Sequence, residues 1–374
     1  MGKFTSRRRV IVFAAALLAA AGTAAVMLYF QKVTPIPVVT PVVIHSDGQN
    51  APVGMVWIPG GEFLMGSEHK KAQANEKPVH RVKVNGFWMD STHVTNDQFA
   101  AFIRATNYRT TAEQIPDWDT IKVQLPPGVA RPPDSIFVPG AMVFVGNSDQ
   151  VYLNDPSQWW AYVPGADWRH PTGPNSDIED IGNHPVVQVS YQDALKYAEW
   201  ADKRLPTEAE WEFAARGGLN QATYAWGDQL EQDGEMQANI WDVKKRPFPV
   251  VSPAAEGAVT TSAAGTYPKN GYGLYDMTGN AWQWVADWYG FEYFAAQVTE
   301  NGDKLIMNPQ GPNQSFDPTD PGVPGNAPKR VIRGGSFLCN EAYCQSYRPS
   351  ARRGSDPFSP MSHLGFRLVT DSSK

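Results

Sequence analysis

Cysteine and histidine are scarce in this chain, which has 374 residues but only two cysteines and seven histidines. Two thiols cannot fill the four positions of a structural zinc site, and no histidine pair lies near them, so zinc is disfavoured. A repeat of fixed period is also missing, which argues against a solenoid or a propeller.

Charged residues are few as well, at 19%, and the net charge is −6. Because residues 1–9 are basic, the remainder is more acidic still, which argues against nucleic acid as a partner. What the chain does have is 13 Trp, 14 Tyr, 32 Gly and 31 Pro, with a hydrophobic content of 42%. This composition predicts a loop-rich fold whose core is held by aromatic side chains.

An uncharged apolar run of 21 residues, Val10–Phe30, follows the basic N-terminus. As a helix it is long enough to cross a bilayer of about 30 Å. A cleavable signal peptide has a shorter apolar core of roughly 7–15 residues, so the length favours an uncleaved anchor. Cleavage within Ala21–Ala25 is the alternative. No cysteine follows the run, which excludes a lipid-modified N-terminal cysteine.

The sequence thus predicts three segments. Residues 1–32 form a cytoplasmic basic tip and a transmembrane signal anchor, and the Pro-rich residues 33–50 form a linker. Residues 51–371 form the globular domain, on the periplasmic or extracellular side of the inner (cytoplasmic) membrane.

Short regular elements are signalled along this domain. Strands are expected within Met55–Gly66 and over Val79–Met89, and Pro-rich surface excursions over residues 117–140 and 290–328. Capping boxes predict the starts of three helices. They are formed by Thr95 with Gln98, Ser190 with Asp193, and Thr207 with Glu210.

Five segments together resemble the formylglycine-generating enzyme family, also called the sulfatase-modifying factor domain. In family order, they are Met55–Ser67, Ala166–Pro174, His184–Gly218, Asn270–Trp288 and Arg333–Arg367. The resemblance implies a mixed α/β (α+β) fold with low regular secondary structure, related to C-type lectins. It does not settle function, because one scaffold can host several activities.

The two cysteines, Cys339 and Cys344, follow a Gly-Gly-Ser turn. An even number of cysteines in an exported protein usually means a disulfide. The resemblance points to an active pair instead, because catalytic members carry two cysteines separated by four residues at this place. Residues without sulfur occupy the positions of the structural cysteines of animal members, namely Ala198, Pro349 and Leu368.

The resemblance implies a copper(I)- and dioxygen-dependent oxidoreductase that acts on a sulfur group. Its client is a sulfatase, or another polypeptide, in which the cysteine of a Cys-x-Pro-x-Arg motif becomes formylglycine. Cys339 and Cys344 would hold copper(I), a soft metal that thiolates favour. Ser336 and Tyr343 would orient ligands or water, and Trp282 would wall the oxygen pocket. A turn role for Ser336 and core packing for Trp282 are the alternatives.

By the same resemblance, Arg352 and His363 belong to the substrate groove, with a solvated surface role as the alternative. Three residues near the cysteines depart from the family pattern. Asn340 replaces a common His, and Gln345 and Ser346 replace an Asn or Tyr and an Arg. These changes leave the metal ligands in place.

The resemblance also implies structural calcium, which takes six to eight oxygen ligands. One site would use Asn239, Ile240, Glu256 and Ala258, and the other Asp276, Gly279, Ala281 and Gln283. Glu256 replaces the usual Asp, and Gln283 replaces a Glu, which removes a charge. The alternative for Asp276 is an ordinary turn residue.

Two rival functions remain. One is a membrane-tethered binding module on the same fold, with a Cys339–Cys344 disulfide. The other is an iron-dependent oxidase such as a sulfoxide synthase. It ranks last, because the seven histidines are scattered singly and the helical domain that usually carries the iron site is missing.

Overall fold

The computed structural model describes residues 51–251 and 259–371. The predicted anchor and linker, residues 1–50, lie outside the described residues. Among the helices that are described, none combines the length and the apolar character that a membrane span requires.

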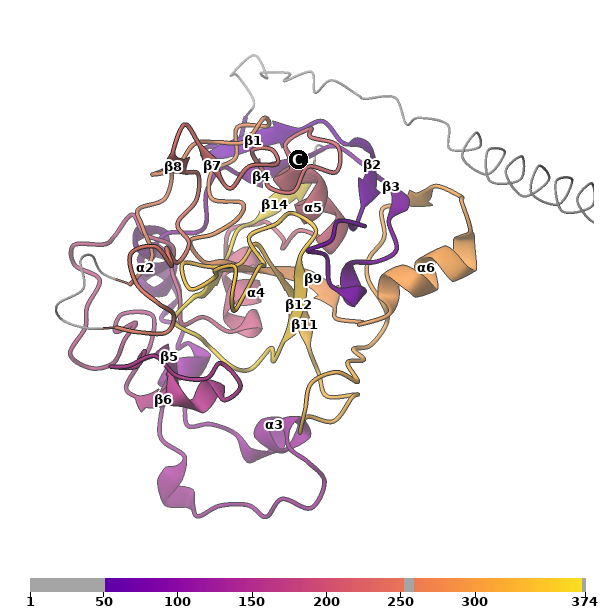
Figure 1. The fold of residues 1–374 in the computed structure, drawn as a ribbon. Helices are drawn as coiled ribbons and strands as arrows, with labels where there is room; N and C mark the ends of the chain where they lie inside the picture. Colours follow the sequence, from indigo (N-terminus) through magenta and orange to yellow (C-terminus); the bar gives the residue numbers. More distant parts are fainter. Residues whose placement is uncertain (1–50, 252–258, 372–374) are drawn as a thin grey trace, which may run out of the picture. The chain divides into compact units, whose positions relative to one another are not determined.

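Small sheets and short helices make up the regular structure (Figure 1), which confirms the predicted mixed α/β class. The sheet that matters most for the site has the strand order β12-β11-β9-β13. Its strands are β9 (Trp282–Trp288), β11 (Arg330–Arg333), β12 (Arg352–Ser355) and β13 (Leu364–Phe366). β11 runs antiparallel to both β9 and β12, whereas β13 runs parallel to β9.

Two three-stranded sheets and two hairpins complete the described β-structure. One sheet contains β1 (Met55–Ile58), β4 (Phe87–Asp90) and β14 (Val369–Asp371), and so joins both ends of the domain. The other contains β2 (Gly61–Met65), β3 (His80–Val84) and β10 (Ile306–Met307). The hairpins pair β5 (Gly140–Phe144) with β6 (Trp160–Pro164), and β7 (Glu231–Gln232) with β8 (Glu235–Met236).

The two strands expected within Met55–Gly66 are present, but the single strand expected over Val79–Met89 was wrong. The extended segment is interrupted between β3 and β4, where the polypeptide passes from one sheet to the other. The break is tightly packed, since a Cβ atom on Gly86 would lie 2.5 Å from the Trp57 ring. A larger residue at this crossing would have to displace the Trp57 ring.

All three predicted helix starts are confirmed. The capping boxes begin α2 (Asn96–Thr106), α4 (Tyr191–Trp200) and α5 (Glu208–Arg216). The Pro-rich excursions hold α3 (Trp118–Ile121) and α6 (Tyr293–Asn301). No side chain caps the start of α6, so no capping pattern predicts this helix.

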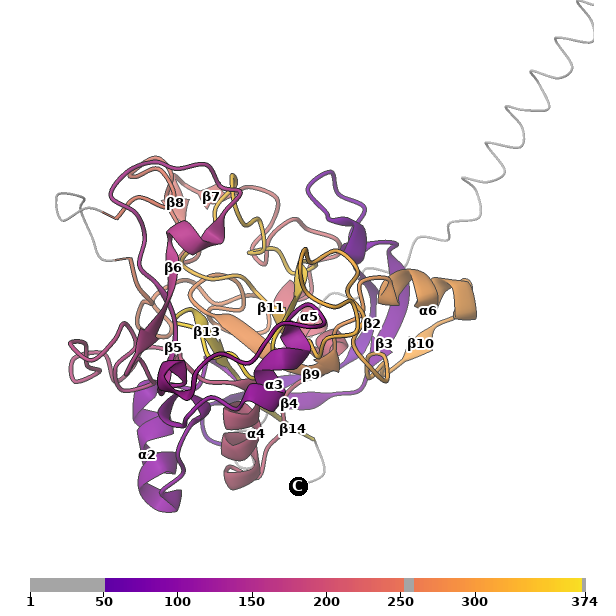
Figure 2. The same ribbon diagram turned by 90° about the horizontal axis from the view of Figure 1, so that it is seen from below.

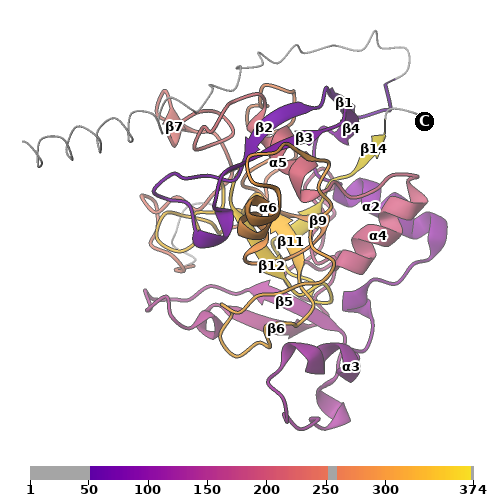
Figure 3. The ribbon, with the colours of Figure 1, turned by 90° about the vertical axis from the view of Figure 1, so that its right-hand side faces the viewer.

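The sheet β12-β11-β9-β13 has two different faces, because side chains alternate along each strand. Gln283 of β9 accepts a hydrogen bond from Trp211 of α5, so this face packs on α5. Its neighbours Trp282 and Trp284 belong to the core cluster on the opposite face, together with both cysteines. The helices α2 and α4, which contribute to that cluster, lie side by side in Figures 2 and 3.

Candidate functional site

The cysteine pair lies on a loop that leaves the end of β11. Two glycines make the turn, with φ of +95° at Gly334 and +69° at Gly335. Added Cβ atoms would lie 2.7 Å from the Met277 carbonyl oxygen and 2.9 Å from the Ser346 backbone. Only glycine fits both the conformation and the space, so this turn fixes where the loop starts.

Backbone hydrogen bonds close the loop around the cysteines. The Cys339 amide donates to the Ser336 carbonyl at 2.9 Å, and the Cys344 amide to the Asn340 carbonyl at 3.1 Å. The Asn340 side chain is buried, and its Oδ1 accepts from two backbone amides, including that of Tyr343 at 3.0 Å. Asn340 thus organises the turn between the cysteines, a role that sequence reasoning missed; the Asx-turn preference of asparagine was the available signal.

Cys339 and Cys344 form a disulfide, with their Cα atoms 4.6 Å apart and both side chains buried. The sequence left open whether these two cysteines form a disulfide or an active pair of thiols. Reduction of the bond would place two thiols side by side, a donor set that suits copper(I). Nowhere in the described residues do three or more His, Cys, Asp or Glu side chains gather as a metal site. The described part of the chain therefore offers copper two sulfur ligands, without further ligands of these types.

The other predicted catalytic residues lie around this loop. Trp282 is buried in the same core cluster as both cysteines, and Tyr343 packs against that cluster. The Tyr343 ring stacks on Phe248, with ring centres 4.5 Å apart. Ser336 is fully buried and its Oγ accepts a hydrogen bond from the Leu338 amide at 3.3 Å. The structure brings these residues together, while their catalytic roles stay predictions.

Arg352 does not line a groove, so its placement among substrate-binding residues is corrected. It is 1% exposed, and its Nε and Nη2 donate to the two Glu208 carboxylate oxygens at 2.6 and 2.7 Å. Its Nη1 donates to the Gly290 carbonyl at 2.8 Å. The side chain faces α5, and a client could reach it only if this core opened.

His363 lies on the other face of the sheet, beside the cysteine loop. Its backbone oxygen accepts from the Trp282 amide at 2.8 Å, and its half-buried ring lies 4.7 Å from that of Trp160. Burial, helped by the Arg353 charge, lowers the His363 pKa to about 3, so the ring is neutral at pH 7. Arg353 is half-buried, with its guanidinium 5.9 Å from the centre of the Trp282 ring. Sequence reasoning missed Arg353, because alternation along β12 indicates only that Arg352 and Arg353 face opposite ways, not which of the two faces the cysteine loop.

The second calcium site does not fit this arrangement. Gln283 Oε1 already accepts hydrogen bonds from Trp211 Nε1 at 2.9 Å and Arg367 Nε at 2.7 Å. The Ala281 carbonyl accepts from His93 Nε2 at 2.8 Å. Two of the four expected oxygen ligands therefore face N–H donors, one of them on an arginine, where a cation would be repelled.

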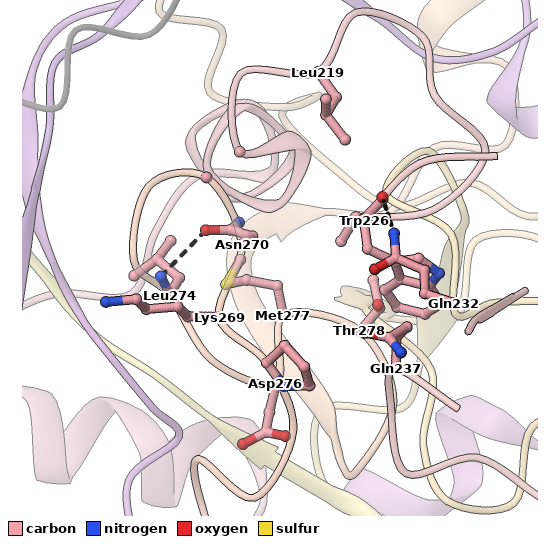
Figure 4. Close-up of a pocket in the computed structure, with 14 residues that line it drawn as sticks. Leu219, Trp226, Gln232, Gln237, Lys269, Asn270, Leu274, Asp276, Met277 and Thr278 are labelled. Atoms are coloured by element: carbon pink, nitrogen blue, oxygen red, sulfur yellow. Dashed lines mark hydrogen bonds between the residues drawn. The ribbon is translucent and has the colours of Figure 1, made fainter. Parts of the chain in front are cut away.

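Asp276, from the same predicted site, is buried and lines a cavity of about 300 Å³ (Figure 4). Its Oδ2 accepts from the Gly265 amide at 2.8 Å, and its Oδ1 has no partner among the described residues. Figure 4 shows this carboxylate pointing away from Trp226 and Gln237 on the far side of the cavity. Asp276 thus behaves as a loop residue held by a backbone amide.

The first predicted calcium site is described only in part, because Glu256 and Ala258 lie outside the described residues. Asn239 and Ile240 line a cavity of about 200 Å³ together with Phe337. The Asn239 side chain donates to the Thr260 carbonyl at 3.1 Å. Calcium at this place stays a prediction.

Comparison with known proteins identifies the family to which this chain belongs. The family model of the sulfatase-modifying factor enzyme 1-like domain matches residues 41–372. The formylglycine-generating enzyme of Mycobacterium tuberculosis is 43% identical over 85% of this chain and 97% of its own length. The inactive Cα-formylglycine-generating enzyme 2 of Bos taurus is 32% identical over 87% of this chain and 91% of its own.

Among solved structures, PvdO from Pseudomonas aeruginosa has a TM-score of 0.51 and 20% identity, with 85% of this chain and 94% of that chain covered. This likeness concerns the fold alone. Fold and site together define a mixed α/β domain in which a paired-cysteine loop follows β11, an inner strand of a small four-stranded sheet. The chain belongs to the sulfatase-modifying factor enzyme 1-like family.

Proposed function

We propose that this protein is an oxidase that converts a cysteine of a client polypeptide to formylglycine. One observation carries the proposal: both cysteines are present, and the glycine turn and Asn340 hold them next to each other. The family includes relatives named formylglycine-generating enzymes and relatives named inactive. The intact pair supports the active class.

Reduction of the Cys339–Cys344 bond takes two electrons and two protons and yields the two thiols. We assign these thiols, as thiolates, to copper(I). When bound, copper(I) supplies a soft centre for a further thiol and a redox couple that can pass electrons to dioxygen. The chain's own contribution is to hold the two sulfur ligands, and the aromatic side chains Trp282 and Tyr343 keep water away.

The proposed client is a sulfatase, or another polypeptide, with a Cys-x-Pro-x-Arg motif. The apolar run Val10–Phe30 supports a location at the inner membrane with the domain outside the cytoplasm. A client would then meet the enzyme while still extended, because a buried cysteine cannot reach the loop.

The test uses the full-length protein, reduced, loaded with copper(I) and mixed with oxygen and a Cys-x-Pro-x-Arg peptide. Mass spectrometry should detect the loss of mass from thiol to aldehyde. Cys339→Ser and Cys344→Ser should each abolish turnover. The matched control is Ala342→Ser, which alters an exposed residue of the same loop and keeps both sulfurs. Undiminished turnover in either cysteine variant would refute the proposal.

The second candidate is a non-catalytic binding module. The disulfide favours it, since a bonded sulfur pair cannot take up a metal. The two candidates differ in redox behaviour. A binding module would bind the peptide without turnover, and its disulfide would resist mild reduction; an oxidase would show titratable thiols and turnover after the same treatment.

A further inference from the structure

Two consecutive arginines on β12 have opposite surroundings. Arg352 is matched by the Glu208 carboxylate. The Arg353 guanidinium forms neither an ion pair nor a hydrogen bond with any of the described residues, and its one ring contact is with Trp282. An arginine without an acid, one residue after a fully paired one, calls for a separate explanation.

Arg353 lies on the face of the sheet that carries the cysteine cluster. It pairs in register with Ile332 of β11, which belongs to the same core cluster as Cys339 and Cys344. Its charge acts on Tyr343, which lies between the two cysteines, on His363 and on Tyr289. Three residues predicted for the site therefore lie within electrostatic range of this guanidinium, namely Trp282, Tyr343 and His363.

The position of Arg353 is unfavourable in the isolated protein. The side chain is half-buried, and removing a guanidinium from water without a counter-ion costs free energy. Burial lowers its pKa, in keeping with that cost. The neighbouring His363 is neutral and offers no compensating charge. A carboxylate from outside would relieve this cost, and the planar guanidinium can bind a carboxylate through two hydrogen bonds.

We propose that Arg353 binds a carboxylate of the client polypeptide, on an Asp or Glu side chain in the segment that carries the target cysteine. This inference rests on the proposed function and gives it a substrate preference. Clients with an acid near the cysteine are bound more tightly than clients with an amide there. The partial exposure of Arg353 lets a bound peptide reach it, which the buried Arg352 does not allow.

The experiment compares Cys-x-Pro-x-Arg peptides that differ only by Asp or Asn, and by Glu or Gln, at each position next to the motif. All carry an amidated C-terminus, and an added set with a free C-terminus separates a terminal carboxylate from a side-chain carboxylate. For the wild-type full-length protein, an acid at the preferred position should lower KM about tenfold, which corresponds to about 1.4 kcal/mol. The difference should lie in KM rather than in kcat.

Variants then assign the preference to one residue. Arg353→Gln should make the acid and amide peptides equivalent, and Arg353→Lys should keep part of the preference. Arg353→Glu should invert it in favour of a peptide with Lys at that position. The matched control is Arg81→Gln, which removes an exposed arginine on β3 and should leave the preference at its wild-type size. A structural role for Arg353 would instead weaken all peptides equally.

A binding measurement separates this inference from the proposed function. Calorimetry with the Cys339→Ser/Cys344→Ser protein and peptides whose target cysteine is replaced by serine needs no turnover. Equal binding of acid and amide peptides would overturn the role of Arg353, even if both peptides are oxidised by the wild type. Discrimination in binding without oxidation of any peptide would support Arg353 as a recognition residue and overturn the oxidase.

Discussion

The two faces of the sheet β12-β11-β9-β13 differ in how they satisfy charge. On the α5 face, Arg333 donates to Glu208 at 2.7 Å and to Glu212 at 2.6 Å, and Arg352 donates to Glu208. All four side chains are at most 1% exposed. On the opposite face, aromatic rings surround a sulfur pair, and Arg353 has no acid among the described residues.

This difference in charge pairing distinguishes the α5 face, which stabilises the fold, from the cysteine face, which carries the candidate site. Burial raises the pKa of Glu208, but the charges of Arg352 and Arg333 outweigh this effect and hold it below its usual value. The α5 face is thus a closed set of paired ions that fixes where β11 ends and where Gly334 begins the cysteine loop. The opposite face keeps groups without partners, as expected where a ligand completes the structure.

The largest effect on stability should come from removing a carboxylate of the paired ions on the α5 face. Glu208→Gln leaves two buried guanidinium groups short of a counter-charge, which should lower the free energy of unfolding by about 3–5 kcal/mol. Urea denaturation of the full-length protein measures this loss. Glu235→Gln, at an exposed position on β8, is the control and should change stability little. A loss below 1 kcal/mol would contradict the view that this face holds the sheet.

Substitutions on the opposite face should have a large effect on function and a smaller one on stability. Replacing both Cys339 and Cys344 by serine should abolish peptide oxidation. The free energy of unfolding should fall by only about 2 kcal/mol, because the disulfide closes a very short loop. Denaturant titration and mass spectrometry on the same sample check both parts. A double variant that does not fold would show that the loop belongs to the scaffold.

Acid and base should affect the two faces in opposite senses. Burial, with help from the Glu208 charge, raises the Asp287 pKa to about 8. The usual pKa of an Asp is about 3.9. The stability that protonated Asp287 contributes to the fold is therefore lost as pH rises from about 4 to 8. The His363 pKa is lowered to about 3 from about 6.5, so its contribution is present above pH 6.5 and is lost as pH falls towards 3.

The free energy of unfolding as a function of pH can separate these contributions. Asp287→Asn should flatten the decline between pH 4 and 8, and its amide oxygen can still accept the Glu208 amide hydrogen bond. His363→Asn should flatten the decline between pH 6.5 and 3. Unchanged slopes in both variants would show that other groups control the pH dependence.

Local signals predicted a good part of this fold. The capping residues Thr95, Ser190 and Thr207 marked three helix starts because the side chain and its backbone partner are three residues apart. The break at Gly86 was missed because β3 and β4 pair with different strands, which lie elsewhere in the chain. Helix α6 was missed because no side chain caps it.

The candidate site was only partly predictable, and the two arginines of β12 explain why. The sequence places Arg352 and Arg353 next to each other, and the resemblance selected Arg352 for the groove. The orientation of the pair depends on Glu208, which lies 144 positions earlier in the chain. A choice between two neighbouring side chains that depends on so distant a partner cannot be made from local pattern.

The smallest effect should come from a surface ion pair at the cysteine loop. Lys71 Nζ lies 2.7 Å from Glu341 Oε1, next to Asn340, but the two side chains are 26% and 54% exposed. Exposed pairs contribute about 0.2–1 kcal/mol and weaken in salt. Glu341→Gln should therefore lower the free energy of unfolding by less than about 1 kcal/mol, with turnover close to wild type. A loss several times larger would mean that the loop depends on charge pairing at its rim, and the contrast between a paired face and an unpaired face would no longer hold.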